Sequence, residues 1–167
     1  MKPLVSIIMG STSDLPVMEA AANFFDEMEI PFEMNALSAH RTPERVEVFA
    51  KNAHKRGIKV IIAGAGMAAH LPGVIASMTS LPIIGVPIKA TMGGIDALLS
   101  IVQMPPGIPV ATVGLNAAKN AAILSAQMLA LSDEKLAGKV HRFKEELKSK
   151  IVKANEDLSE VNFKFKV

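Results

Sequence analysis

The sequence predicts an α/β fold in which a five-stranded parallel sheet lies between two layers of helices. Two observations support this prediction: short apolar runs alternate with helical patterns along the chain, and those runs are apolar on both faces. Strands that are buried on both faces are typical of parallel sheets covered by their crossover helices. Right-handed crossovers between such strands give a doubly wound, flavodoxin-like three-layer sandwich.

The first half of the chain is expected to supply three strands and two helices. Residues 4–9 are a first buried strand, and apolar side chains then recur at helical spacing from Val17 to Met28. Residues 31–37 are the second strand. A second helix has one apolar face from Val46 to Ala53 and is expected to end at Gly57. Residues 59–63, the most continuously apolar run, are the third strand.

The second half continues the alternation. Residues 82–86 and 108–113 are the fourth and fifth strands, with helices expected around 71–78, 94–102 and 117–131. The stretch from Ala97 to Ala118 carries no charge, but prolines at 105, 106 and 109 break it. It therefore predicts a helix, a turn and a buried strand, and no membrane span. The whole chain, 1–167, is expected to be one domain, with the sandwich in residues 1–131.

Residues 132–167 are expected to form a long extra C-terminal helix and a tail. An apolar stripe runs along a charged helical segment from Leu136 to Ile151, and the helix is expected to reach about Lys153. Roughly 20 residues make about 30 Å of helix, which is longer than a five-stranded sheet needs as cover. Two interpretations stay open: a last helix on its own domain, or an arm that packs on a neighbouring subunit.

Composition excludes several classes of protein. Half of the 167 residues are hydrophobic, which favours burial of apolar surface between subunits of a homo-oligomer. The net charge of +2 contains no basic run, and Trp and Tyr are absent, so neither a nucleic-acid footprint nor a base-stacking platform is expected. Without cysteine there is no disulfide or thiolate site. No signal peptide precedes the first strand, so a cytoplasmic location is expected.

The first candidate site loop is Gly10-Ser11-Thr12-Ser13-Asp14, between the first strand and the first helix. Ligands of open parallel sheets bind at the carboxyl ends of the strands. The hydroxyls of Ser11 and Ser13 lie beside free helix N–H groups, an arrangement suited to a phosphate. The alternative is ordinary helix capping, for which Ser and Asp are the commonest residues.

The second loop is Ser38-Ala39-His40-Arg41-Thr42-Pro43, between the second strand and the second helix. Pro43 suits the first turn of a helix capped by Thr42, which places His40 and Arg41 at the strand end. Arg41 can hold a phosphate through two hydrogen bonds, and a histidine exchanges protons near neutral pH. The alternative is a packed histidine and an arginine paired with Glu44.

The third loop runs from Gly64 to Gly73. Small residues such as Gly66 and Ala68 let the backbone approach a ligand closely, and His70 is the only ionisable side chain. The alternative is close packing of a helix on the sheet. The Gly-x-Gly spacing does not indicate a dinucleotide site, because it follows the third strand and no acidic residue ends the next one.

Other functional classes fit these loops less well. His54 and His141 lie among charges on amphipathic helices and are expected at the surface, and His40 with His70 would lack a third metal ligand. A phospho-receiver domain would need an acidic pair after the first strand and an aspartate after the third. A flavin carrier would be expected to stack the ring on Trp or Tyr.

Taken together, the motifs resemble those of a known family. Gly-Ser-x-Ser-Asp, Ser-Ala-His-Arg-Thr-Pro and Ala-Gly-Ala-Gly-x-Ala-Ala-His-Leu-Pro-Gly, followed by Ser-Ile-Val-Gln-Met-Pro at 100–105 and Asn-Ala-Ala at 120–122, are similar to the bacterial, class I N5-carboxyaminoimidazole ribonucleotide mutases. The match runs in order from about residue 4 to 131. Met67 is a departure, since relatives often have glycine there.

The resemblance implies a cofactor-free isomerase of purine biosynthesis that acts on a small-molecule ribonucleotide. It implies that His40 transfers protons, that His70 is a second pocket histidine, and that the substrate is bound by Ser11, Asp14 and Arg41 with support from Ser13 and Ser38. It further implies a homo-octamer in which C-terminal helices embrace neighbours. Two alternatives remain: a carboxylase that uses carbon dioxide directly, and a non-catalytic ribonucleotide-binding module.

Overall fold

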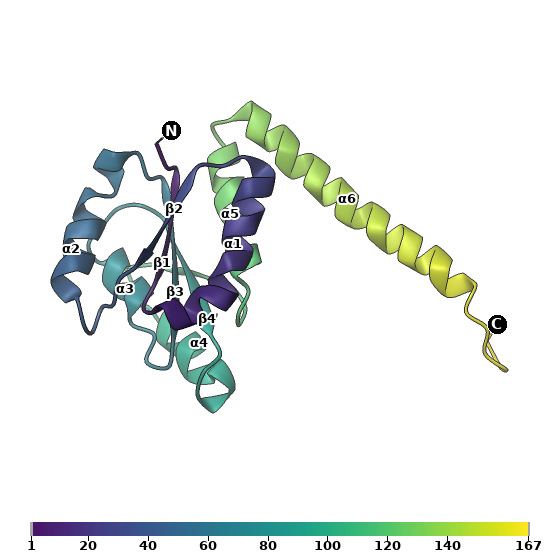
Figure 1. The fold of residues 1–167 in the computed structure, drawn as a ribbon, viewed down its shortest axis with the longest axis horizontal. Helices are drawn as coiled ribbons and strands as arrows, with labels where there is room; N and C mark the ends of the chain where they lie inside the picture. Colours follow the sequence, from purple (N-terminus) through teal and green to yellow (C-terminus); the bar gives the residue numbers. More distant parts are fainter. Residues whose placement is uncertain (1, 167) are drawn as a thin grey trace.

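The centre of the computed structural model, which describes residues 2–166, is a sheet of five parallel strands (Figure 1). The strands lie in the order β2-β1-β3-β4-β5, the order found in flavodoxin-like sheets. The fold class predicted from the sequence is confirmed. The bounds of the strands are β1 Val5–Met9, β2 Phe32–Ala36, β3 Val60–Gly66, β4 Ile83–Ile88 and β5 Ala111–Thr112.

Helices cover both faces of the sheet and make it the middle layer of three (Figure 1). On one face lie α1 (Leu15–Met28) and α5 (Ala118–Ala130), and on the other lie α2 (Pro43–Asn52), α3 (Leu71–Ala76) and α4 (Ile95–Val102). Three short 3-10 turns, η1 (Thr12–Asp14), η2 (His54–Arg56) and η3 (Met92–Gly94), complete the connections. Within residues 2–166, none of the helices combines the length and the apolar character that crossing a membrane would need.

Two hydrophobic clusters fill the spaces between the layers. Ile7 belongs to the cluster under α1 and α5, whereas the next residue, Ile8, belongs to the cluster under α2, α3 and α4. Successive side chains of a strand point to opposite faces, so a strand between two helical layers needs apolar residues at both odd and even positions. The continuous apolar runs in the sequence have this structural cause.

The third strand is longer than predicted. It continues beyond Ala63 to Gly66, because β3 stays paired with β4 through Ala65↔Pro87 and Gly66↔Ile88. Gly64 lies inside this strand, where a Cβ atom would come within 2.5 Å of Met18 Sδ. A Cβ atom at Gly64 would displace the buried Met18 side chain, so this glycine serves the close approach of α1 to the sheet and not a loop.

Two further boundaries differ from the predicted ones. The second helix ends at Asn52, and the separate turn η2 leads to Gly57, whose φ of 100° is left-handed. The fifth strand is reduced to Ala111–Thr112. Only these two residues pair with β4, through Ile84↔Ala111 and Gly85↔Thr112.

The first part of α6 (Glu134–Ser159) packs on the sandwich. Asp133 caps the helix by accepting a hydrogen bond from the Leu136 N–H at 2.9 Å, and Leu136 is buried. The Phe143 ring packs edge-on against Phe24 with 5.2 Å between centroids. Lys139 donates a hydrogen bond of 2.9 Å to the carbonyl of Met28, at the end of α1.

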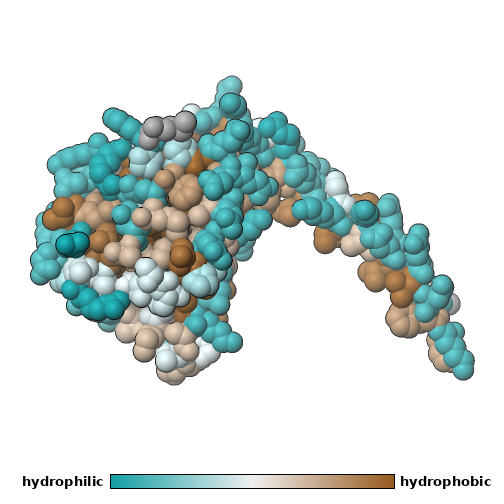
Figure 2. Space-filling view, viewed as in Figure 1, coloured by the Kyte–Doolittle hydropathy of each residue, from teal (hydrophilic) through white to brown (hydrophobic). Residues whose placement is uncertain are grey.

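Beyond Phe143, α6 projects away from the sheet (Figure 1) and exposes its apolar side chains. Leu147 is 45% exposed and Ile151 is 72% exposed, and Leu158 is exposed near the end of the helix. Figure 2 shows these hydrophobic side chains along the projecting helix. With 26 residues, α6 is about 39 Å long. It ends at Ser159, six residues beyond the predicted end near Lys153.

Candidate active site

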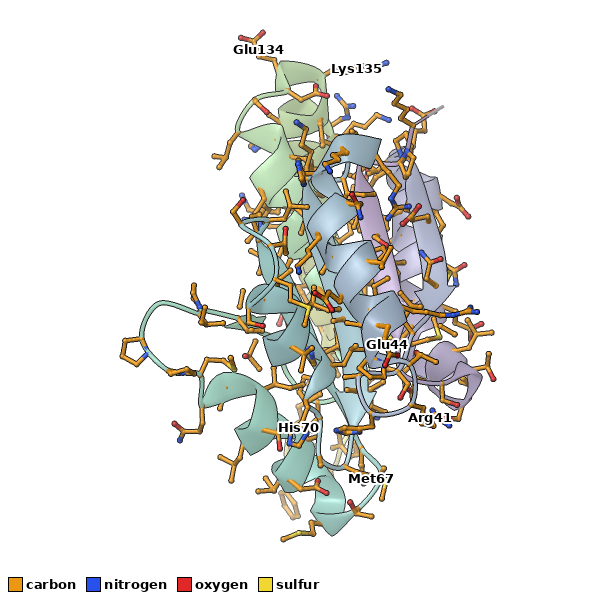
Figure 3. All side chains as sticks on the ribbon, turned by 90° about the vertical axis from the view of Figure 1, so that its left-hand side faces the viewer. Arg41, Glu44, Met67, His70, Glu134 and Lys135 are labelled. Carbon is orange, nitrogen blue, oxygen red and sulfur yellow. The ribbon has the colours of Figure 1, made fainter. Side chains whose placement is uncertain are left out.

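All nine predicted site residues line one pocket at the carboxyl ends of β1, β2 and β3. Its volume is about 600 Å³, within the range of small-molecule sites. Arg41, Met67 and His70 lie at this end of the molecule, whereas Glu134 and Lys135 lie at the opposite end (Figure 3). The nine residues are Ser11, Ser13, Asp14, Ser38, His40, Arg41, Gly66, Ala68 and His70.

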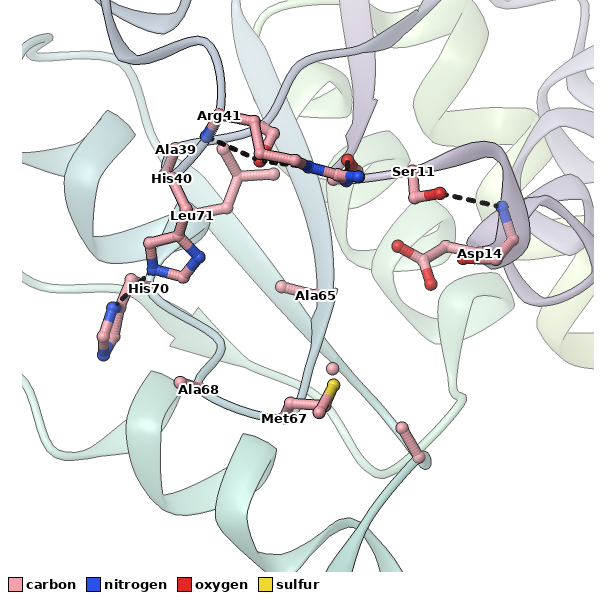
Figure 4. Close-up of a pocket in the computed structure, with 15 residues that line it drawn as sticks. Ser11, Asp14, Ala39, His40, Arg41, Ala65, Met67, Ala68, His70 and Leu71 are labelled. Atoms are coloured by element: carbon pink, nitrogen blue, oxygen red, sulfur yellow. Dashed lines mark hydrogen bonds between the residues drawn. The ribbon is translucent and has the colours of Figure 1, made fainter.

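The first loop turns from β1 into α1 through η1. The Ser11 hydroxyl accepts a hydrogen bond from the Ser13 N–H at 3.3 Å, as a helix cap does (Figure 4). Burial raises the pKa of the Asp14 carboxyl, while Ser11, Ser13 and the Arg41 charge act in the opposite direction. Ser11 therefore caps the turn, as the alternative interpretation predicted, and it also lines the pocket.

The second loop is folded by hydrogen bonds between Ser38 and Thr42. The Thr42 hydroxyl donates to the Ser38 carbonyl at 3.1 Å and accepts from the Ser38 N–H at 3.1 Å. Thr42 stands at the N-cap of α2 as predicted, but its hydroxyl closes this loop and makes no cap hydrogen bond to the helix. The closed turn presents His40 and Arg41 toward the pocket.

Arg41 joins the first two loops. Its Nη2 donates to the Gly10 carbonyl at 2.7 Å, and its Nε donates to the Ser38 hydroxyl at 3.3 Å (Figure 4). Arg41 does not form the alternative ion pair with Glu44. A guanidinium held beside the Ser11 hydroxyl and the start of α1 is suited to an anionic group such as a phosphate.

The two predicted histidines are in direct contact. His40 Nε2 lies 2.8 Å from His70 Nδ1, and the rings meet edge-on at 81° with centroids 4.9 Å apart. In such a contact one ring nitrogen donates and the other accepts, so the pair shares a proton. Both rings are exposed to the pocket. Together they can take up and return a proton at a bound ligand.

The third loop supplies an apolar wall. Gly66 ends β3, and a Cβ atom there would lie 3.1 Å from the Ile88 carbonyl oxygen and 3.4 Å from the Ala90 Cβ. Ala90, which follows β4, also lines the pocket and was not predicted. The sequence feature that could have predicted Ala90 in the pocket wall is a small residue soon after β4, the strand next to β3.

The remaining histidines lie elsewhere, and no metal cluster is formed by the described residues. His54 and His141 are exposed, as predicted from their helical context. Across residues 2–166, no three His, Asp or Glu side chains are grouped so that they could hold a metal ion.

Comparisons with known proteins show the family of this chain. A profile of the family described as AIR carboxylase matches residues 4–150. The chain is 54% identical over 163 residues to an N5-carboxyaminoimidazole ribonucleotide mutase of Thermotoga maritima, covering 97% of this chain and 95% of that protein. It is 56% identical over 143 residues to a phosphoribosylaminoimidazole carboxylase of Saccharomyces cerevisiae, covering 85% of this chain but 25% of that longer protein.

A solved structure is similar along the whole chain. The crystal structure of Treponema denticola PurE2-S38D aligns with a TM-score of 0.86 at 31% sequence identity, covering 95% of this chain and 99% of that one.

Proposed function

This chain belongs to the AIR carboxylase family, and on that premise we propose that it is an isomerase of purine biosynthesis that converts N5-carboxyaminoimidazole ribonucleotide to 4-carboxy-5-aminoimidazole ribonucleotide. The observation that carries the proposal is the 2.8 Å contact between His40 and His70 in a pocket that also holds Arg41. One side of the pocket offers proton transfer, and the other offers an anion site.

The reaction needs a proton at two moments. His40 protonates the carbamate nitrogen, the C–N bond breaks with its electron pair on nitrogen, and carbon dioxide is released. The electron-rich imidazole carbon then attacks the same carbon dioxide and forms a C–C bond. His40 takes the proton that leaves this carbon, so the histidine ends in its starting state. No electron is gained or lost by an external partner, and the steps consume no cofactor.

His70 serves His40 as a hydrogen-bonding partner. Its Nδ1 is in contact with His40 Nε2, so it orients the His40 ring. Proton transfer at the ligand then falls to Nδ1, the other nitrogen of His40. Because the ring is already held in one orientation, no conformational entropy is lost in orienting it during the reaction.

The first two loops bind the ribonucleotide. Arg41 with Ser11 and Ser13 takes the phosphate, and Asp14 accepts hydrogen bonds from ribose hydroxyls. Ser38 accepts hydrogen bonds from the backbone N–H and the Nε of Arg41 at 3.2 and 3.3 Å, which supports the guanidinium. Gly66 and Ala68 let the imidazole lie flat against the third loop.

The alternative activity, carboxylation by free carbon dioxide, is separated from the isomerase by one assay. The carbamate and aminoimidazole ribonucleotide are offered separately at low and at physiological bicarbonate, and the C-linked acid is measured. Efficient turnover of the carbamate at low bicarbonate supports the isomerase. Carboxylation of aminoimidazole ribonucleotide at physiological bicarbonate, with the carbamate ignored, would contradict it, and binding of the carbamate without turnover would indicate a non-catalytic module.

The assembly belongs to the same proposal: a homo-octamer in which the outer part of α6 packs on a neighbouring subunit. The exposed stripe of Leu147, Ile151 and Leu158 supports this arrangement, because large contiguous apolar patches are uncommon on monomers. A helix of this amphipathic kind gains stability mainly from packing of its apolar face.

A pair of matched substitutions tests the role of α6. Ile151→Asp places a charge on the stripe, whereas Ser149→Asp places the same charge about 200° around the helix. Light scattering is expected to show smaller species for Ile151→Asp and the parental mass for Ser149→Asp. The parental mass for both variants would mean that the apolar stripe of α6 does not hold the assembly together.

A further inference from the structure

Met67 stands in an unusual conformation at the pocket. It follows the last residue of β3 with φ of 56°, a left-handed backbone conformation. For a residue with a Cβ atom this conformation costs about 1–2 kcal/mol, whereas glycine adopts it freely. The Met67 side chain is also 56% exposed. At Met67 the chain therefore accepts both a backbone cost and an exposed apolar side chain.

Met67 lies in the wall of the pocket among residues with small side chains. Met67 is part of the pocket lining, and Figure 4 shows it below Ala65, between the histidine pair and Asp14. Its neighbours on this wall, Ala65, Gly66 and Ala68, carry at most a methyl group. Within residues 65–68, Met67 is therefore the one pocket-lining residue with a long side chain.

A second methionine, Met92, has a similar backbone conformation outside the pocket. Met92, in the connection after β4, also has a left-handed backbone, with φ of 44°, and is 77% exposed. It does not line the pocket. Met92 therefore provides a control with the same residue type, a similar backbone conformation and a similar exposure.

We propose that Met67 is a flexible apolar flap that covers the bound ligand and retains carbon dioxide in the pocket between the two steps of the reaction. This inference rests on the proposed isomerase function. Carbon dioxide is free after the C–N bond breaks and before the C–C bond forms, so it either recombines or escapes. Methionine is unbranched and has three rotatable bonds, so its side chain can swing aside for the substrate and then exclude water from the apolar wall.

The proposal predicts where the effect of Met67 will be seen. A flap over the carbon dioxide changes the partition between recapture and escape, whereas the proton transfers of His40 are unaffected. The observable is therefore the origin of the product carboxylate. Carbon dioxide that stays in the pocket yields unlabelled product even when the surrounding bicarbonate is labelled.

The experiment supplies unlabelled carbamate in ¹³C-bicarbonate with carbonic anhydrase and measures the ¹³C fraction of the product by mass spectrometry at low conversion. The parent is expected to incorporate little label. Met67→Ala removes the long side chain and keeps the Cβ atom, so the backbone stays restricted. Met67→Gly removes the side chain and also makes the backbone more flexible. Both are expected to raise the ¹³C fraction at least about threefold, with Met67→Leu and Met92→Ala close to the parent.

The possible results separate the two proposals. Equal ¹³C fractions in the parent and Met67→Ala, with normal turnover, would overturn the flap and leave the isomerase standing. A rise in Met67→Gly alone would also overturn it, because loop flexibility and not the side chain would then control escape. An equal rise in Met92→Ala would overturn the flap as well, because a general loosening of the fold and not the Met67 side chain would then account for the escape of carbon dioxide. A parent that does not turn over the carbamate at all would overturn the isomerase function and the flap with it.

Discussion

Replacing His40 by asparagine is expected to lower turnover at least a hundredfold with little effect on ligand binding or stability. The magnitude follows from the contribution of a general acid–base group, about 10²–10⁴ in rate. A hundredfold loss corresponds to about 2.7 kcal/mol of barrier. Asparagine is polar and of similar size, but it cannot carry a proton between the nitrogen and the carbon of the ligand.

The structure also limits the effect on stability. The His40 ring is exposed and makes one side-chain hydrogen bond, to His70 at 2.8 Å, so its loss costs no more than about 1 kcal/mol. In a chain of this length that corresponds to a shift in melting temperature of at most about 4 °C. A larger shift would mean that the variant damages the fold and does not report on the chemistry.

The assay measures initial rates of carbamate loss and of C-linked acid formation, together with calorimetric binding of the product. His54→Asn, an exposed histidine that does not line the pocket, is the matched control and is expected to keep parental rates. If His40→Asn retained activity within a few-fold of the parent, His40 would not be the proton-transfer residue.

Three further predictions concern binding and stability. Arg41→Ala is expected to weaken binding of the product roughly 10- to 150-fold, because a charge-assisted hydrogen bond contributes about 1.5–3 kcal/mol; unchanged affinity in titration would contradict the phosphate role. Asp14→Asn is expected to melt at a higher temperature than the parent at pH 7, because burial raises the pKa of Asp14 and so penalises its ionised form. That penalty is present above the raised pKa of the folded state and is lost below the ordinary value of 3.8, so the difference should shrink as the pH falls; a difference that is constant with pH would refute this origin. Gly64→Ala is expected to lower the free energy of unfolding in urea by about 1–3 kcal/mol, because its Cβ would lie 2.5 Å from Met18 Sδ. Gly10→Ala, with no heavy atom within 4 Å of the added Cβ, should not have this effect, and equal losses would point to backbone entropy instead of a clash.

The layered fold could be predicted because burial on both faces of a strand is visible in adjacent residues. Ile7 and Ile8 face opposite layers, and both must be apolar whatever the order of the strands. Helical spacing from Val17 to Met28 likewise reflects one local face. The end of β3 could not be predicted in this way, because Gly64 and Gly66 weaken a strand by their own propensity and are held in it by pairing with β4.

The outer part of α6 shows a different limit. The sequence predicts an amphipathic helix and leaves its partner open. The structure divides the stripe, with Leu136 buried against the chain's own core and Ile151 exposed. A partner for Ile151 would lie outside one chain, and the pattern of a single helix does not encode such a surface.

The sequence by itself determined which residue types stand at the strand ends. Ser11, Arg41 and His70 each follow a strand, and the ends of parallel strands lie at one edge of the sheet. Only the tertiary structure decided which of these side chains touch. β1 lies between β2 and β3, so the loops after β2 and β3 meet above its end, and His40 and His70 come within 2.8 Å across 30 residues of sequence. Such a contact depends on strand spacing and side-chain rotamers, which no local pattern encodes. The same holds for the hydrogen bond of Arg41 to the Gly10 carbonyl and for the left-handed backbone of Met67 in the pocket wall.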